Sequence, residues 1–231
     1  SAADKTEDEL AFEQGVRDIA IDLGTNVRVG EVLGHDRRRA LINYVAEHGI
    51  DLVLAEMPKG NRPGRLFGGD LRWLREHLGC DTAFLRTRAG GRLESIAMMG
   101  AGGPYDALKV ELADRLATAS GGTVRFVHVV GGDAAQRQVD GIGEYHEELM
   151  KLGRAKTTSS VIRSDDVVEA LGAIASDADL VILGASLRRF HFFADLADRI
   201  AERVDCSVLL VEAKDTARRT FLGRLLEKFI Y

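Results

Sequence analysis

Apolar residues follow two spacings along the second half of the chain, and the two spacings alternate. Short apolar runs predict strands at 94–99, 124–130, 180–183 and 207–211, and a more polar strand runs through Val161 and Ile162. Apolar residues three and four apart predict helices between the strands, at 108–119, 139–152, 168–175 and 196–204. Strands that are apolar on both faces and alternate with helices are typical of a parallel sheet covered on both sides. Residues 94–213 are therefore predicted to form a doubly wound, five-stranded parallel α/β unit.

Two helix ends carry capping signals. Gly153 is expected to end the second of these helices in the left-handed conformation. Ser164 or Asp165 is expected to open the third, because short polar side chains accept hydrogen bonds from the first free amides of a helix.

An internal repeat organises the whole chain. The segment 51–56 matches 179–184 at an offset of 128, and Gly24, Asp36, Asp70 and Cys80 match Gly153, Asp165, Asp195 and Cys206 at offsets of 125 to 129. The first copy is predicted to contain a helix ending at Gly24 and helices at 36–48 and 71–78, with strands at 27–33, 52–57 and 82–85. It lacks a counterpart of residues 94–132. We expect a partial lobe at 1–90, a complete domain at 91–215 and a helix at 216–231, with the two copies packed through their last strands.

Composition narrows the classes of function. The 231 residues include 36 acidic and 31 basic side chains, a net charge of −5, so general attraction to nucleic acid is not expected. Only two cysteines are present and no apolar run is long enough to span a bilayer, which favours a reduced cytoplasmic protein. Attachment to the inner face of the cell membrane through a partner remains open.

The loop that follows the first strand of the complete copy is a candidate anion site. Gly102, Gly103 and Pro104 precede a helix, whose free amides could hold a phosphate. Gly184, Ser186, Arg188 and Arg189 follow the fourth strand, which is predicted to end beside that loop. As an alternative to an anion site, Gly102, Gly103 and Pro104 form only a tight turn between strand and helix. The alternative for Arg188 and Arg189 is a solvated pair in a loop.

The partial copy has a basic, glycine-rich loop in the corresponding place. Its candidate anion-binding residues are Lys59, Gly60, Arg62, Gly68 and Gly69. The opposite wall of a binding crevice is missing from this copy, so a surface loop is the alternative.

Catalytic and metal-binding patterns are not found in the sequence. The six histidines show no ligand spacing, no GxSxG is present and Ser186 has no evident base, so neither a catalytic nor a metal residue is assigned. His128 is interpreted as a core histidine with a satisfied ring, and the segment 145–148 as a solvated helix face. Cys80 and Cys206 are expected to be small buried side chains.

The segment 216–231 has the pattern of a basic amphipathic helix. An apolar stripe formed by Phe221, Leu222, Leu225, Leu226, Phe229 and Ile230 lies among four basic residues. This helix could contact a membrane surface or a partner. The alternative is that it packs on the protein itself or across a homodimer.

The order of elements, the segment 179–184 and the closing segment 197–211 resemble the universal stress protein family, whose fold is of the adenine nucleotide alpha hydrolase type. The residues 101–104 and the tandem arrangement resemble the cytosolic tails of amino-acid permeases and cation transporters. The resemblance implies either a non-catalytic regulatory module that acts on a transporter domain of the same or a partner chain, or a sensor of ATP, AMP or a cyclic dinucleotide.

The family's ATP-binding glycine pattern is largely altered here, which favours the regulatory module. Leu187 stands where the second glycine belongs, and Ala194 and Asp195 stand where glycine and a hydroxyl residue belong. A carboxylate at that place repels phosphate. An adenine nucleotide is the one cofactor class that the resemblance implies.

Overall fold

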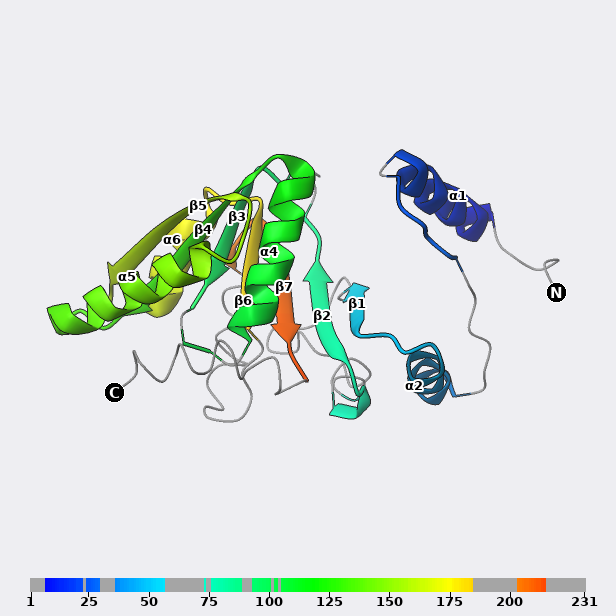
Figure 1. Cartoon of the computed structure of the whole chain (residues 1–231), viewed down its shortest axis with the longest axis horizontal. Helices are drawn as coiled ribbons and strands as arrows, with labels where there is room; N and C mark the ends of the chain where they lie inside the picture. Colours follow the sequence, from blue (N-terminus) through cyan, green and yellow to red (C-terminus); the bar gives the residue numbers. More distant parts are fainter. Residues whose placement is uncertain are drawn as a thin grey trace. The chain divides into compact units, whose positions relative to one another are not determined.

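The computed structural model describes residues 7–22, 24–29, 36–56, 73, 76–88, 93–100, 102, 103, 105–184 and 203–214 (Figure 1). The chain divides into two compact units, residues 1–44 and 45–231. The first unit contains α1 (Glu7–Asp22), which is followed by Gly24 at a φ of 59°. Helix α2 (Arg37–Glu47) crosses the division, and the Asp36 carboxylate accepts hydrogen bonds from the amides of Arg38 and Arg39 at its start.

A seven-stranded sheet forms the centre of the second unit, in the order β1-β2-β7-β6-β3-β4-β5. The strands are β1 (Leu52–Glu56), β2 (Asp81–Arg86), β3 (Ser95–Met99), β4 (Thr123–Val130), β5 (Lys156–Arg163), β6 (Leu180–Gly184) and β7 (Ser207–Glu212). All neighbours are parallel except β2 and β7, which pair antiparallel. The five-stranded parallel sheet predicted for residues 94–213 is therefore confirmed as β3 to β7.

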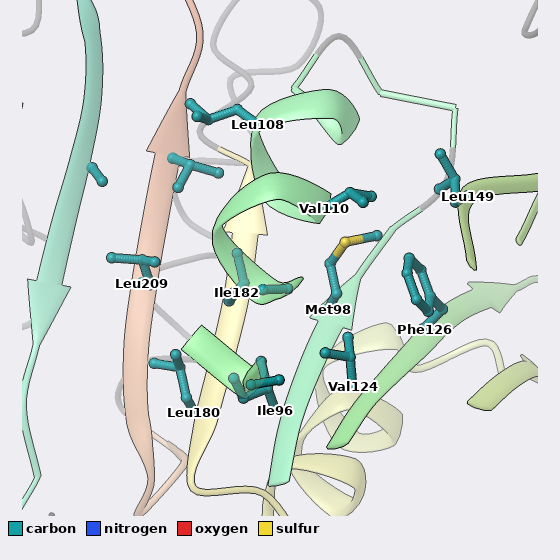
Figure 2. Close-up of a cluster of buried hydrophobic side chains, with 14 of the residues drawn as sticks. Ile96, Met98, Leu108, Val110, Val124, Phe126, Leu149, Leu180, Ile182 and Leu209 are labelled. Atoms are coloured by element: carbon teal, nitrogen blue, oxygen red, sulfur yellow. The ribbon is translucent and has the colours of Figure 1, made fainter. Parts of the chain in front are cut away.

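Alternation along the strands divides the core into two clusters, one on each face of the sheet. Ile96 and Met98 of β3 belong to one cluster, while Ala97 and Met99 belong to the other. Figure 2 shows the first cluster, where Leu180 and Leu209 project from the neighbouring strands β6 and β7 beside Ile96 and Ile182. Because both faces are buried, the central strands are continuous apolar runs, as the sequence predicted.

Helices cover the two faces. Residues of α4 (Asp106–Ser120) and α5 (Gln136–Met150) belong to the cluster in Figure 2, and those of α6 (Val167–Ala175) belong to the other. Asp166 caps α6 by accepting a 2.9 Å hydrogen bond from the amide of Glu169, one residue later than the predicted cap. None of the helices among the described residues has the length and apolar character that a membrane span requires.

The structure differs from the expectations for the strand at 27–33 and for Gly153. Residues 27–29 of the strand expected at 27–33 are not a strand, and residues 30–35 lie outside the described residues. Gly153 is not left-handed, because α5 ends three residues earlier at Met150. A Cβ on Gly153 would lie 2.6 Å from Asp114 Oδ1, and this carboxylate binds the amides of Arg154 and Ala155. Glycine is therefore needed at position 153 because the Asp114 side chain lies where a Cβ would be.

The expected lobes meet inside one sheet. The last strand of the expected first lobe, β2, pairs with the last strand of the second, β7, as the sequence analysis anticipated. The boundary expected at residue 90 therefore falls between strands of one continuous sheet, and the description of the two segments as copies stays a prediction. The helix expected at 196–204 lies mostly outside the described residues, and the helix expected at 216–231 lies entirely outside them.

Candidate functional site at the carboxyl ends of β3 and β6

The winding direction of the sheet reverses beside β3. The chain moves outward from β3 to β4 and β5, then crosses to β6 on the other side of β3 and continues to β7. Ligands of open parallel sheets bind beyond the carboxyl ends of the strands at such a reversal. The site to consider is therefore the region where Met99 and Gly184 end their strands.

The turn after β3 depends on glycine. Gly100 has a φ of 88° and Gly102 a φ of 75°, in the left-handed region that favours glycine. The amide of Gly103 donates a 3.1 Å hydrogen bond to Asp106 Oδ2, so this amide is already engaged. The φ values and this bond fit the tight-turn alternative, while binding of an anion by Gly102 and Gly103 stays a prediction.

A buried network of charged and polar groups lies directly under this turn. Asp106 and Lys109 face each other in the first turn of α4, with the ammonium 2.7 Å from Asp106 Oδ1, and both are almost fully buried. The same ammonium donates a 2.8 Å hydrogen bond to the carbonyl of Met99, the last residue of β3. Lys109 therefore neutralises Asp106 and satisfies a strand-end carbonyl.

Tyr145 of α5 completes the network. Its hydroxyl donates a 2.8 Å hydrogen bond to Asp106 Oδ2, and its side chain is buried. Burial, followed by the nearby Asp106 carboxylate, raises the pKa of Tyr145 far above its ordinary value. Tyr145 therefore stays protonated and acts as a donor, not as a base.

Two histidines lie close to this network and are kept neutral. Burial, with a smaller effect of His128, lowers the pKa of His146 to about 4. Burial also lowers the pKa of His128, assisted by Lys109. His146 Nδ1 lies 2.7 Å from Ser159 Oγ, whereas His146 Nε2 and His128 Nδ1 are buried without a hydrogen-bond partner. The ring of His128 is thus less satisfied than the sequence interpretation assumed.

Tyr105 packs against the end of β6. A Cβ placed on Gly184 would lie 3.1 Å from Cδ2 of the Tyr105 ring. Glycine at position 184 therefore lets an aromatic side chain of this chain pack against the end of β6. The space beside Gly184 is therefore taken by a side chain of the protein itself.

The structure brings together only part of the predicted site. Gly102, Gly103 and Gly184 lie at the crevice. The other candidates lie outside the described residues, namely Pro104, Ser186, Arg188, Arg189, Lys59, Gly60, Arg62, Gly68 and Gly69. Within the described segments, no group of three or more His, Cys, Asp or Glu side chains is arranged to hold a metal ion.

The residues that dominate the site were not predicted from the sequence. Asp106 and Lys109 have the spacing of a helical ion pair, but nothing in the pattern indicated that both would be buried. The segment 145–148 was predicted to be a solvated face, yet Tyr145 and His146 are buried, while Glu147 is exposed and Glu148 is half-buried. Cys80 and Cys206 are free and buried, as predicted.

Comparisons with known proteins indicate the fold. No protein-family model matches the chain, and no curated protein matches it. The cytoplasmic domain of a prokaryotic cation chloride cotransporter is similar in structure, with a TM-score of 0.65 and 11% identity over 91% of this chain and 82% of that one. A universal stress protein from Archaeoglobus fulgidus gives a TM-score of 0.59 at 11% identity, covering 92% of this chain and 81% of the other.

A putative universal stress protein from Pseudomonas aeruginosa gives a TM-score of 0.57 at 15% identity, covering 97% of this chain and 84% of the other. Identities this low establish a shared fold and do not carry function from one protein to another. The chain has the α/β fold, with a mostly parallel sheet, of universal stress proteins and of a transporter's cytoplasmic domain.

Proposed function

We propose that this chain is a non-catalytic regulatory module on the cytoplasmic side of a membrane transporter, built from two universal stress protein-like lobes. The transporter would be an amino-acid permease or a related cation transporter, in the same chain or in a partner. The observation that carries the proposal is the crevice at β3 and β6, where Tyr105 packs on Gly184 and Lys109 binds the Met99 carbonyl. A crevice that holds the protein's own side chains favours protein contact over ligand turnover.

Two further observations support this role. One structural neighbour is the cytoplasmic domain of a cation chloride cotransporter, and the likeness extends over 91% of this chain. Tyr145 of the buried network stays protonated near pH 7, and the neighbouring His146 stays neutral. A general acid or base near neutral pH needs a pKa close to the operating pH, which neither group has.

The test of this proposal uses cells that produce the chain. Cross-linking in the membrane fraction, followed by mass spectrometry, is expected to join the chain to a polytopic transporter. Removal of the module is expected to change the initial rate of solute uptake while the amount of transporter stays constant. An unchanged uptake rate contradicts the regulatory role.

A nucleotide sensor is the second candidate, because the turn through Gly100 and Gly102 has the backbone shape that lets a ligand approach closely. In this alternative Gly102, Gly103, Pro104, Gly184, Ser186, Arg188 and Arg189 would hold ATP, AMP or a cyclic dinucleotide. Thermal-shift titration with these three ligands distinguishes the candidates, since a ligand selective for the native state raises the melting temperature.

The variant Tyr105→Ala sharpens the titration. If Tyr105 occupies the place of a base or ribose, the wild-type protein shows no shift and Tyr105→Ala shows one. A saturable shift of the wild-type protein that is lost in Arg188→Ala with Arg189→Ala supports the sensor instead.

A further inference from the structure

A cavity of about 760 Å³ lies at the end of the sheet opposite to the crevice. Leu180 and Ser207, which begin β6 and β7, line it together with Asp179. All of its lining residues belong to the unit 45–231. It is therefore separate from the network around Asp106, which lies where β3 ends.

The floor and one wall of this cavity are apolar. Leu52 and Leu54 of β1, Leu85 of β2 and Leu209 of β7 line the floor. They share one face, because the strand registers pair Leu54 with Ala83 and Leu85 with Leu209. Leu112 and Leu116 of α4 line the wall. Leu54 is 60% exposed, so apolar surface is left open here.

The position of α4 explains why the cavity exists. This helix packs on β3, β4, β6 and β7, and it ends at Ser120. The sheet continues beyond β7 to β2 and β1, while Leu112 and Leu116 face the space above them. Cavities of about 300–1,000 Å³ are typical of small-molecule sites, and this volume falls within that range.

Three arginines from separate elements line the same cavity. Arg88 follows β2, Arg115 belongs to α4 and Arg203 precedes β7. Arg115 is already paired with Glu111 at 2.9 Å, so Arg88 and Arg203 are the cations that can meet a ligand, and two carboxylates also line the cavity. One of them, Asp179, already accepts hydrogen bonds of 2.8 and 2.9 Å from the amides of Glu94 and Ser95. Arginine forms paired hydrogen bonds with carboxylates, so the charged part of the lining favours an anion.

We propose that the cavity binds a single-chain anionic amphiphile, of the class of medium-chain fatty carboxylates. The alkyl chain lies over the leucine floor between Leu54 and Leu116, and the carboxylate meets the guanidinium groups of Arg88 and Arg203. Apolar walls of this extent favour an alkyl chain over a polar metabolite, and the arginines favour a carboxylate over an alcohol. This site is independent of the regulatory role proposed above.

Calorimetric titration of the whole chain with dodecanoate, below the concentration at which it forms micelles, tests the proposal. We expect saturable binding of one molecule per chain. Dodecanol is expected to bind at least about tenfold more weakly, because it lacks the charge that the arginines recognise. Equal affinity for dodecanoate and dodecanol, or no saturable binding, overturns the proposal.

Two pairs of variants locate the site. Leu54→Trp fills the cavity from an exposed position and is expected to weaken binding about tenfold or more, whereas Leu152→Trp, at a 49% exposed leucine outside the cavity, leaves it unchanged. Arg203→Ala weakens binding, and Arg137→Ala on the exposed surface of α5 does not. Equal losses in both members of either pair overturn the assignment. If removal of residues 216–231 creates the binding, the chain's own tail is the occupant and the proposal is wrong.

Discussion

Tyr145 donates a 2.8 Å hydrogen bond to Asp106, and this single bond connects α5 to the first turn of α4. Both side chains are at most 2% exposed. The bond therefore lies in the protein interior, where the loss of one partner is costly because the other keeps its desolvation penalty.

The network around Asp106 gives the first prediction. Tyr145→Phe is expected to lower the free energy of unfolding by about 1–2 kcal/mol, because Asp106 keeps its bonds to Gly103 and Lys109. Lys109→Met is expected to cost about 3–5 kcal/mol, since it leaves a buried carboxylate without its cation. Urea unfolding measures both.

The double variant is the control for this prediction. Asp106→Leu combined with Lys109→Met removes both charges. The double variant is expected to lower the free energy of unfolding by less than the sum of the losses in Asp106→Leu alone and Lys109→Met alone. A cost equal to the sum would show that the two groups do not interact.

The second prediction concerns pH. The pKa of His146 is about 4 in the folded protein and ordinarily 6.5, so between these values the unfolded chain binds a proton that the folded chain does not. The contribution of neutral His146 to the free energy of unfolding is therefore fully present above pH 6.5. It is lost as the pH falls through 4, by about 3 kcal/mol in total. His146→Gln is expected to flatten this slope in urea unfolding. An unchanged slope in His146→Gln would contradict this prediction.

Glycine positions provide a matched pair for the third prediction. A Cβ on Gly122 would clash with the carbonyl oxygens of Leu93 and Glu94, so Gly122→Ala is expected to cost about 2–4 kcal/mol. Gly143 lies within α5 with nothing near its Cβ position, so Gly143→Ala is expected to add about 0.5–1 kcal/mol. Thermal unfolding separates the two by the sign of the shift.

The cysteines give the fourth prediction. Burial raises the pKa of both Cys80 and Cys206, so both thiols remain protonated at about pH 8. We expect iodoacetamide to alkylate them slowly in the native protein and rapidly after denaturation in urea, as followed by mass spectrometry. Rapid native alkylation of either thiol would contradict its burial.

The fifth prediction tests whether the strands on the two sides of residue 90 unfold together. Phe84 of β2 is 1% exposed and packs in a cluster with residues of β3, β4, β6 and β7. Phe84→Ala is expected to cost about 3–5 kcal/mol and to shift a single unfolding transition. Leu54→Ala, at an exposed leucine, is expected to change stability by less than about 1 kcal/mol. Two separate transitions would indicate lobes that fold independently.

The central strands were predictable because their apolar runs are buried on both faces, and β3, β4, β6 and β7 lie where those runs predicted them. The more polar β5 was predicted through Val161 and Ile162 alone. The burial of Tyr145 and His146 was not predictable from the sequence. Consecutive helical residues point in different directions, so at least one of them normally faces solvent. Here both are covered by protein, because Tyr145 contacts Asp106 of α4 and His146 contacts Ser159 of β5. Two adjacent faces of α5 are covered by different elements, and a sequence pattern contains no information on such a neighbour.

The candidate site was predictable only in its location. The reversal of winding between β3 and β6 follows from the order of elements, which the sequence contains. The occupation of the crevice depends on how far Tyr105 and Lys109 reach from α4 and the residue before it, which only the tertiary structure determines.

The antiparallel junction of β2 and β7 has a mechanical consequence. Thr82 pairs with Glu212, so the chain enters β2 and leaves β7 at the same end of the ladder. A force applied between these two points acts in an unzipping geometry. It loads the hydrogen bonds of the ladder one after another and is not shared among them. The bond from the amide of Lys214 to Asp81 Oδ1, 2.8 Å long, is the first to bear that load. Tension on the residues after β7 would therefore open the sheet from its Asp81 end.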